Sequence, residues 1–514
     1  MIPYKTYLAC FFIAALISLA FTPLVIRLAR ALGAIDRPVD RKIHKRPVPR
    51  LGGVSVFVSM WVPLILLCFY DNIVVQQVLT HELQLLLTFT GGLAMLCVGI
   101  VDDIHGINAR WKFAFQFPVA ILLVAGGVRF DSVYMPLVGH FDLGFLGPFI
   151  SVFWLVGATN AMNLIDGIDG LAAGVAYLIA TSLAILAIQA GNMAMLVVVM
   201  SALAGACLGF LRYNVQPARI FLGDSGSLFL GMTLAISATF GSVKDKVGTS
   251  LLVPAVLIGY PIADTLISMA RRYLRGKPVF TGDASHLHHR LLYKGMDHRH
   301  ACQVMYGVCL VFCLWAFAIQ RQSLPLMMLG MVSVAMLIVF GLYRLGYLEY
   351  FQSEKVARER NAFKAVNYYA EMIKAKIQLA QNRDDLVRLL QDASEEYRQL
   401  ALEVFIPSSI LGDALAVSPS SRSTLADTAV QDRYHYDNTG FGVTAHYAAK
   451  TAKEELILEQ RRLFGEICAA ANHCLVELTE AAHKDPQPRP GTTGTSVPDQ
   501  AVGHKRDWDL GPRT

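Results

Sequence analysis

The stretch NAMNLIDGIDGLA, residues 160–172, joins two strongly apolar segments and places two Asn and two Asp side chains within ten positions. Carboxylates in apolar surroundings are costly and need a partner or a function. The whole 514-residue chain is 54% apolar and has a mean hydropathy of +0.45, which is too apolar for an ordinary soluble globule. We therefore interpret the chain as an integral membrane protein whose chemistry is concentrated at polar joints of this kind.

Apolar runs of about 20 residues, the length of a membrane-spanning helix, recur over the first two thirds of the chain. They predict an all-α, polytopic membrane domain over residues 1–345 with about eleven transmembrane helices. The predicted helices are at 7–26, 51–69, 84–101, 111–128, 144–159, 170–189, 193–211, 226–241, 250–270, 302–319 and 324–343.

Lys and Arg gather in alternate connections between these helices. Residues 27–50 hold eight of them and residues 271–299 hold seven, whereas the intervening connections offer only Arg129, Lys244, Lys246 and Arg321. Basic residues near helix ends stay on the cytoplasmic side, so the pattern predicts an external N-terminus and a cytoplasmic C-terminus. The net charge of +6 follows from the same bias and requires no nucleic-acid partner.

After Arg344 the composition becomes charged and polar. Helical or heptad-like spacing predicts an amphipathic helix or coiled coil over 346–406, then a linker and helical tail over 407–482 and a disordered end over 483–514. This tail is a candidate surface for a homodimer or a protein partner. The nine cysteines show no paired metal-ligand spacing.

Four polar clusters fall on one side of the predicted topology. They are Asp102 with Asp103, the residues 160–169, Asp224 and the run 286–290. Any one cluster could consist of helix caps and loop residues. Four clusters on one face favour a site, and carboxylates suit Mg²⁺, which binds one or two of them and completes its shell with water and phosphate oxygens. The sequence therefore predicts phosphoryl transfer at a membrane surface.

The motifs VGIVDD (98–103), NAMNLIDGIDGLA (160–172), FLGDSGSLFLG (221–231) and HLHHRL (286–291) occur in this order. Together they resemble the polyprenyl-phosphate N-acetylhexosaminyl-1-phosphate transferases, the glycosyltransferase 4 family, and most closely the branch that uses UDP-N-acetylglucosamine. The resemblance covers about residues 1–345. It implies transfer of a sugar 1-phosphate from the UDP-sugar to undecaprenyl phosphate with release of UMP, which starts a lipid-linked envelope polysaccharide such as an O-antigen. It also implies a Mg²⁺ cofactor, with Mn²⁺ as the alternative, and a site on the cytoplasmic face of the bacterial inner membrane.

The resemblance also implies residue roles. Asp102 and Asp103 match a pair of catalytic acids, the first of which deprotonates the lipid phosphate, while Asp224 matches the catalytic acid that holds the metal, with Asn163 as its companion ligand. The implied substrate-binding residues are Lys45, Asn160, Asp166, Asp169, Phe221, His286, His288, His289 and Arg290.

Several alternatives stay open. Lys45 could serve only membrane orientation, the histidines could bind zinc, Asp264 could pair structurally with a nearby arginine, and attack could be direct or pass through an aspartyl intermediate. Another UDP-N-acetylhexosamine could be the donor. A transporter would place polar residues near the midplane and repeat them between halves, which this sequence does not do. A membrane scaffold is the remaining competitor.

Overall fold

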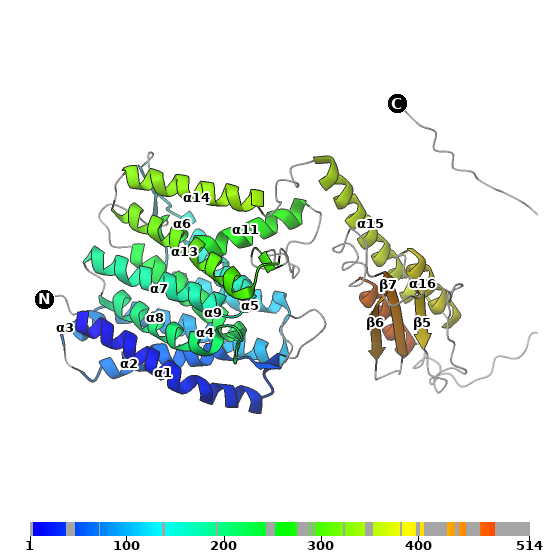
Figure 1. The fold of residues 1–514 in the computed structure, drawn as a ribbon, viewed down its shortest axis with the longest axis horizontal. Helices are drawn as coiled ribbons and strands as arrows, with labels where there is room; N and C mark the ends of the chain where they lie inside the picture. Colours follow the sequence, from blue (N-terminus) through cyan, green and yellow to red (C-terminus); the bar gives the residue numbers. More distant parts are fainter. Residues whose placement is uncertain are drawn as a thin grey trace, which may run out of the picture. The chain divides into compact units, whose positions relative to one another are not determined.

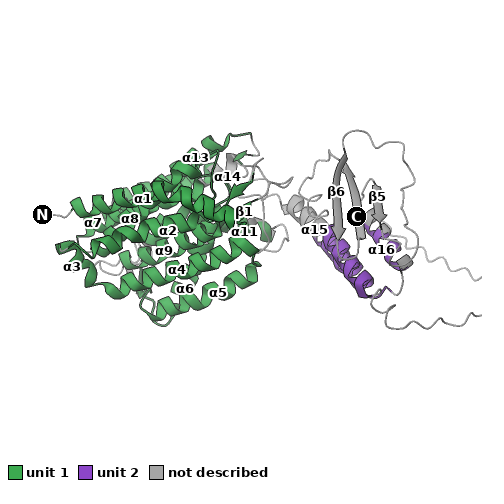
Figure 2. Cartoon of the chain, turned by 90° about the horizontal axis from the view of Figure 1, so that it is seen from below, with its two compact units in different colours: residues 1–360 green, residues 361–514 purple. Residues whose placement is uncertain are grey.

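The computed structural model describes residues 4–36, 47–70, 72–135, 139–191, 194–242, 252–274, 287, 291–292, 295–321, 324–344, 353–380, 383–396, 401–405, 429–436, 441–448 and 463–477. The chain divides into two compact units, Met1–Arg360 and Asn361–Thr514 (Figure 2). Each unit is described by itself below.

The first unit is a bundle of helices (Figure 1). Its principal helices are α1 (Tyr4–Ala31), α2 (Gly52–Leu67), α4 (Glu82–His105), α5 (Ala109–Ala125), α6 (Leu146–Ile165), α7 (Leu171–Ala190), α8 (Ala194–Asn214), α9 (Gly223–Ser242), α10 (Leu252–Leu257), α11 (Gly259–Leu274), α13 (His298–Gln320) and α14 (Leu324–Arg344). In its described residues each of the eleven predicted apolar ranges contains a helix, with differences of a few residues at the ends, and the range 250–270 is interrupted at Ile258 between α10 and α11. The sequence did not predict α3 (Ile73–Leu79) or two short hairpins, β1 (Ile35–Asp36) with β2 (Val48–Pro49) and β3 (Ser132–Met135) with β4 (Gly139–Asp142).

The bundle has the apolar exterior of a membrane protein. Among the described residues, six helices are long and apolar enough to cross a bilayer: α1, α4, α6, α7, α8 and α13. Leu8, Phe12 and Leu16 of α1 are each more than half exposed. A water-soluble surface rarely shows such a stripe, whereas lipid accommodates it. The protein is therefore a helical membrane protein, and the full number of eleven spans stays a prediction.

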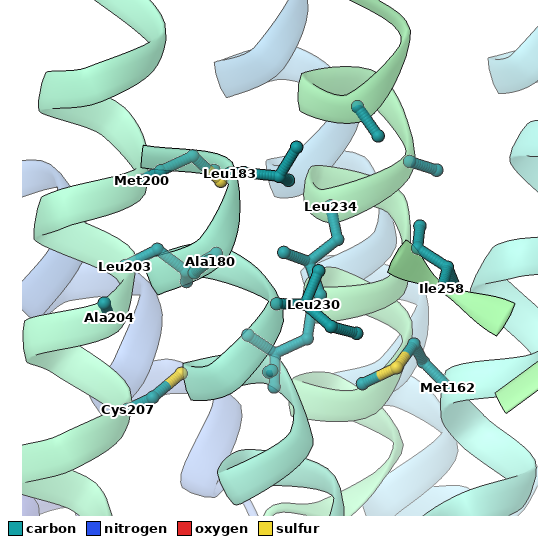
Figure 3. Close-up of a cluster of buried hydrophobic side chains, with 14 of the residues drawn as sticks. Met162, Ala180, Leu183, Met200, Leu203, Ala204, Cys207, Leu230, Leu234 and Ile258 are labelled. Atoms are coloured by element: carbon teal, nitrogen blue, oxygen red, sulfur yellow. The ribbon is translucent and has the colours of Figure 1, made fainter. Parts of the chain in front are cut away.

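Helix α9 is at the centre of the bundle. Every residue from Ser225 to Phe240 is buried, and α9 packs against α2, α4, α6 and α7. Figure 3 shows Leu230 and Leu234 of α9 among Met162 of α6, Leu183 of α7 and side chains of α8, all of them buried. The N-terminus of α9 is therefore held firmly, and this is the end that carries Asp224.

Glycines let the helices that surround this end approach closely. A Cβ atom at Gly99 of α4 would collide with the backbone of Asp224 and Ser225, and one at Gly53 of α2 would collide with the backbone of Gly226. Small residues at helix contacts are the usual way to bring membrane helices together. Here they bring the acids of α4 within hydrogen-bond distance of α9.

The second unit contains both helices and strands. Its elements are the greater part of α15 (Ser353–Gln378), which enters this unit at Asn361, then α16 (Arg383–Glu396), β5 (Ala401–Phe405), β6 (Ala429–Tyr436), β7 (Phe441–Ala448) and a helical segment at 463–477. The strands form an antiparallel sheet in the order β5-β7-β6, in which Val443 pairs with both Val404 and Tyr434. Apolar residues of α15, α16 and 463–477 share one core with Val443.

The prediction that the ordered parts of the tail are helical was therefore wrong for β5, β6 and β7. Within the linker and helical tail predicted over 407–482, residues 429–436 form β6 and 441–448 form β7, and residues 463–477 are helical. The sequences AVQDRYHY and FGVTAHYA contain the β-branched and aromatic residues that favour strands, and the helical interpretation overlooked them. Within the predicted range 346–406 the structure has the helices α15 and α16 and also the strand β5, and the predicted amphipathic or coiled-coil role of this range stays a prediction. The residues between β5 and β6 and the end over 483–514, predicted to be a linker and disordered, lie outside the described residues.

Candidate active site

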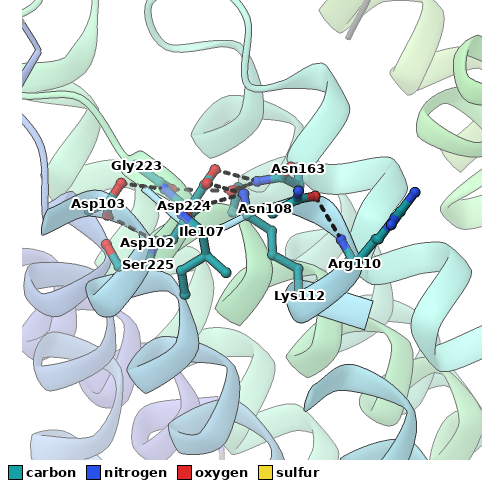
Figure 4. Close-up of polar contacts among 11 residues, drawn as sticks. Asp102, Asp103, Ile107, Asn108, Arg110, Lys112, Asn163, Gly223, Asp224 and Ser225 are labelled. Atoms are coloured by element: carbon teal, nitrogen blue, oxygen red, sulfur yellow. Dashed lines mark hydrogen bonds and ion pairs between the residues drawn. The ribbon is translucent and has the colours of Figure 1, made fainter. Parts of the chain in front are cut away.

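The two adjacent acids of α4 have different surroundings, although both are buried. The Asp103 carboxylate accepts hydrogen bonds from the backbone N–H groups of Asp224, at 2.9 Å, and Ser225, at 3.0 Å (Figure 4). These groups belong to the first turn of α9, where unpaired N–H groups and the helix dipole favour an anion. Gly223 precedes them with φ +74°, and a Cβ atom there would collide with the same carboxylate. Asp103 thus joins the end of α4 to the start of α9.

The Asp102 side chain points toward a lysine instead. Its Oδ1 accepts the backbone N–H of Ile107 at 2.5 Å, and its Oδ2 forms an ion pair with Lys112 of α5. The same ammonium group lies 2.5 Å from Oδ2 of Asp224. The Asp102 side chain is only 6% exposed and that of Lys112 19%, so these charges are largely shielded from water. Lys112 therefore bridges the acids of two different motifs.

Helix α6 is the fourth helix, after α4, α5 and α9, that contributes a side chain to this cluster. The Nδ2 of Asn163 donates to Oδ1 of Asp224 at 2.6 Å and to Oγ of Ser227 at 2.8 Å. Both oxygens of Asp224 are thus oriented, one by the Asn163 carboxamide and the other by the Lys112 ammonium. The structure brings together Asp102, Asp103, Asn163 and Asp224, four of the predicted residues, at one end of the bundle.

Asn160 lies one turn before Asn163 but has a different partner. Its Nδ2 donates to Oε1 of Gln116, at 2.6 Å, and to the carbonyl of Val156, at 2.8 Å. Gln116 is fully buried in α5, four residues after Lys112. The Asn160 carboxamide therefore joins α6 to α5, and its predicted contact with a nucleotide stays a prediction.

Asp166 and Asp169 lie beyond the end of α6. Asp166 caps that helix, and burial together with the nearby carboxylate of Asp103 raises the pKa of Asp166 to about 7, although the Arg50 guanidinium lowers it. Asp169 accepts the backbone N–H of Ala218 at 3.0 Å. The two acids thus have separate tasks: Asp169 holds the segment that leads into α9, whereas Asp166 remains close to the acid cluster.

The segment before α9 is also fixed to the start of α2. The N–H of Phe221 donates to the carbonyl of Pro49 at 2.9 Å, and the carbonyl of Phe221 accepts from Gly52 at 3.1 Å. The basic segment that ends at Arg50 therefore reaches the same end of the bundle as the acid cluster. The predicted site residues Lys45, His286, His288, His289 and Arg290 lie outside the described residues.

Comparison with known proteins identifies the family. Residues 85–242 match glycosyl transferase family 4. A probable undecaprenyl-phosphate N-acetylglucosaminyl 1-phosphate transferase of Bacillus subtilis is 35% identical over 331 residues, which are 64% of this chain and 88% of the relative. The chain belongs to glycosyl transferase family 4.

Two further relatives of this chain have different names. A decaprenyl-phosphate N-acetylglucosaminephosphotransferase of Mycobacterium tuberculosis is 33% identical over 347 residues, covering 63% of this chain and 85% of the relative. A phospho-N-acetylmuramoyl-pentapeptide-transferase of Moorella thermoacetica is 35% identical over 301 residues, covering 54% and 88%. The family resemblance inferred from the four motifs is confirmed, and so is the expectation of a phosphotransferase.

The donor set of this family member fits a hard divalent cation. Among the described residues no three His, Cys, Asp or Glu side chains are grouped as a complete metal cage. Mg²⁺ does not require such a cage, because one or two carboxylates suffice when substrate phosphates and water supply the other oxygens. Asp102 and Asp224 contact the same ammonium group, so their oxygens already converge on a point that accommodates positive charge. The carboxamide of Asn163 lies beside them.

Sequence reasoning missed two basic residues at this site. Lys112 was counted as part of a transmembrane segment, although a lysine in an apolar helix is costly and therefore calls for an acidic partner. That signal could have found it. Arg50 was treated only as part of the basic loop, yet its charge lowers the pKa of Asp166.

Proposed function

We propose that this protein transfers N-acetylglucosamine 1-phosphate from UDP-N-acetylglucosamine to undecaprenyl phosphate and thereby starts a lipid-linked envelope polysaccharide. An oxygen of the lipid phosphate attacks the β-phosphorus of the donor, the bond from that phosphorus to the bridging oxygen breaks, and UMP leaves. The names of the two N-acetylglucosamine relatives support the sugar and the polyprenyl acceptor. Another UDP-N-acetylhexosamine is the alternative donor.

The convergence of Asp102, Lys112 and Asp224 is the observation that carries this proposal. Phosphoryl transfer depends mainly on positioning the reactants and on compensating the charge of the phosphates. The Lys112 ammonium supplies a positive charge at the point where α4, α5 and α9 meet. Asn163 keeps Asp224 in one orientation, so the charge of that carboxylate is fixed before substrates arrive.

The surroundings of the paired acids favour Asp102 as the group that takes the acceptor's proton. Both oxygens of Asp103 accept backbone N–H bonds from α9, which suits a positioning role. Asp102 makes its second contact with the Lys112 side chain rather than with backbone, and that ammonium can turn to a phosphate when substrate binds. Direct attack needs no covalent intermediate on either acid.

Mg²⁺ would be held by Asp224 with Asn163 and Asp102 nearby, and Mn²⁺ is the second candidate. When bound, the ion neutralises charge on the donor diphosphate. The other tasks fall to the protein's own residues. They hold Asp224 in place and keep Asp102 close to the acceptor phosphate, and the Lys112 ammonium compensates negative charge.

We place this site on the cytoplasmic side of the bacterial inner membrane. The basic residues of 27–50 predict that side, and the hydrogen bonds of Phe221 with Pro49 and Gly52 connect the end of this segment to the segment that precedes Asp224. The UDP-sugar is available in the cytoplasm, so the location is consistent with the proposed donor. Lys45 and the motif at 286–290 are proposed to contact the donor.

The test is transfer of radiolabel from UDP-N-acetylglucosamine into a butanol-extractable lipid by the purified protein with undecaprenyl phosphate. We expect labelled lipid and an equal amount of UMP, both dependent on a divalent cation. Asp224→Asn should abolish product, while Asp142→Asn, in the β3–β4 hairpin, serves as the matched control. Label transfer from a different UDP-N-acetylhexosamine alone would change the donor, and no transfer from any donor would refute the function.

A further inference from the structure

Helix α15 has an apolar face that packs inside its own unit. Val366, Ala370, Ile373 and Ile377 of this helix contact the core formed with α16 and residues 463–477. These positions are four, three and four residues apart, which places them on one side of a helix. The packing face of α15 is therefore already satisfied within one copy of the chain.

A second apolar stripe runs along the opposite side of the same helix. It consists of Ala365, Tyr368, Met372 and Ala375 of α15 and of Leu379, the first residue after the helix, and these follow each other at intervals of three, four, three and four. At roughly 100° per residue the four helical positions face away from the packed side. Tyr368 is 81% exposed and Leu379 is 79% exposed, so the described part of the chain leaves this stripe uncovered. We call these five residues the α15 stripe.

The spacing of the α15 stripe is that of the a and d positions of a coiled coil. Ala365, Met372 and Leu379 are then a positions, and Tyr368 and Ala375 are d positions. A shallow depression lined by Ala365, Tyr368 and Met372 lies on this surface, together with Lys364 and Tyr369. Alternating small and large residues of this kind allow a knob from a second helix to insert.

We propose that the α15 stripe binds the α15 stripe of a second copy of this chain, forming a parallel two-stranded coiled coil. Glu371 and Lys376 flank the stripe at the g and e positions. In a parallel pair, a g residue faces the e residue five positions later on the other helix. Glu371 of each copy would therefore face Lys376 of the partner helix, and two-fold symmetry forms this ion pair twice.

The membrane domain favours the parallel arrangement. Only residues 345–352 separate the end of α14 at Arg344 from the start of α15 at Ser353. Two copies in one bilayer have the same orientation, so both α15 helices begin on the same side of the membrane. The stripe is short, about two heptads, and short helices associate weakly in dilute solution. Confinement of both copies to a membrane raises their effective concentration and compensates for this.

The bilayer surface is the competing occupant, since Lys364 and Lys376 flank an apolar stripe as in an interfacial helix. The charge pattern distinguishes the two. Glu371 forms an ion pair with Lys374 of its own helix at 2.6 Å, and its 72% exposed side chain leaves a carboxylate oxygen for a second cation. A lipid surface attracts both lysines and gains nothing from Glu371, whereas a second copy uses Glu371 and Lys376 as a complementary pair. The inference concerns assembly and does not depend on the proposed reaction.

The first test measures self-association of the full-length protein in proteoliposomes by energy transfer between two differently labelled populations. We expect Met372→Glu, which places a charge inside the stripe, to weaken association at least about tenfold. Glu371→Lys and Lys376→Glu should each weaken it about threefold to tenfold, because each makes two like-charge contacts. The double variant Glu371→Lys/Lys376→Glu should return to within about twofold of wild type. Absence of rescue in the double variant would overturn the parallel pairing.

A second test uses oxidative cross-linking in the same proteoliposomes. Leu379→Cys should form a disulfide with its counterpart on another copy, and Gln378→Cys, one residue away from the stripe, should not exceed the wild-type background. Transferase activity should be unchanged in both variants because neither residue is near Lys112 in the sequence or part of the acid cluster. Equal cross-linking of both variants, or quenching of a label at position 379 by spin-labelled lipids, would refute the second-copy assignment.

Discussion

Replacing Lys112 by Met removes the ammonium group that lies between two carboxylates. Asp102 and Asp224 both contact this group, and their side chains are 6% and 29% exposed. If the carboxylates remain roughly 4 to 5 Å apart, Coulomb's law with an effective dielectric constant of about 20 gives about 3 to 4 kcal/mol of repulsion. Partial exposure of Asp224 and proton uptake reduce this value, so we expect a loss of about 2 kcal/mol in the free energy of unfolding.

This expectation can be checked in two assays on protein purified in the same detergent. Lys112→Met should lower the thermal midpoint by several degrees without divalent cations, and Mg²⁺ should restore more of it in the variant than in the wild type. Transferase turnover should fall by about two to three orders of magnitude, the usual cost of removing one preorganised charge. Arg110→Met, two residues earlier on α5, is the matched control. A midpoint within 1 °C of wild type, or turnover within about twofold of it, would refute the bridging role of Lys112.

Three further predictions concern packing, pH and thiol chemistry. Gly99→Leu should destabilise the membrane domain by about 1 to 3 kcal/mol or more, because the new side chain meets the backbone of Ser225; a thermal midpoint equal to that of wild type would contradict this. Because the pKa of Asp166 is raised to about 7, the folded protein keeps a proton between about pH 4 and 7 that the unfolded chain has lost, so the thermal midpoint should fall as the pH rises through this range. Asp166→Asn should remove that part of the pH dependence, and an identical profile in the variant would argue against the assignment. Burial raises the pKa of the thiols of Cys468 and Cys474, so maleimide at pH 7 should label them slowly in the native protein and rapidly after denaturation; rapid native labelling would mean that this core is open.

The positions of the helices could be predicted from the sequence because lipid imposes one simple requirement, a continuous apolar run with internally satisfied backbone groups. Each of the eleven predicted ranges contains a helix in its described residues. The break at Ile258 and the sheet of the second unit were missed for a common reason. A short helix or strand gains its stability from the residues packed against it, and a local pattern does not contain them.

The candidate site could be predicted in part. Its acids were found because motifs at 98–103, 160–172 and 221–231 are far apart in the chain yet fall on one side of the predicted topology. The residue types of Asp102 and Asp103 do not distinguish them physically, and apart from the family resemblance only their contacts in the structure do. One faces the ammonium group of Lys112, and the other holds the first turn of α9.

The sequence by itself determined a helical membrane protein of glycosyl transferase family 4 with its acids at one end of the bundle, because hydropathy and ordered motifs are local properties of the chain. The tertiary structure decided which of those acids meet, which lysine neutralises them and which face of α15 is left uncovered. These are properties of contacts between distant segments. They depend on how closely glycines such as Gly99 let helices approach, and no single segment of the sequence specifies that distance.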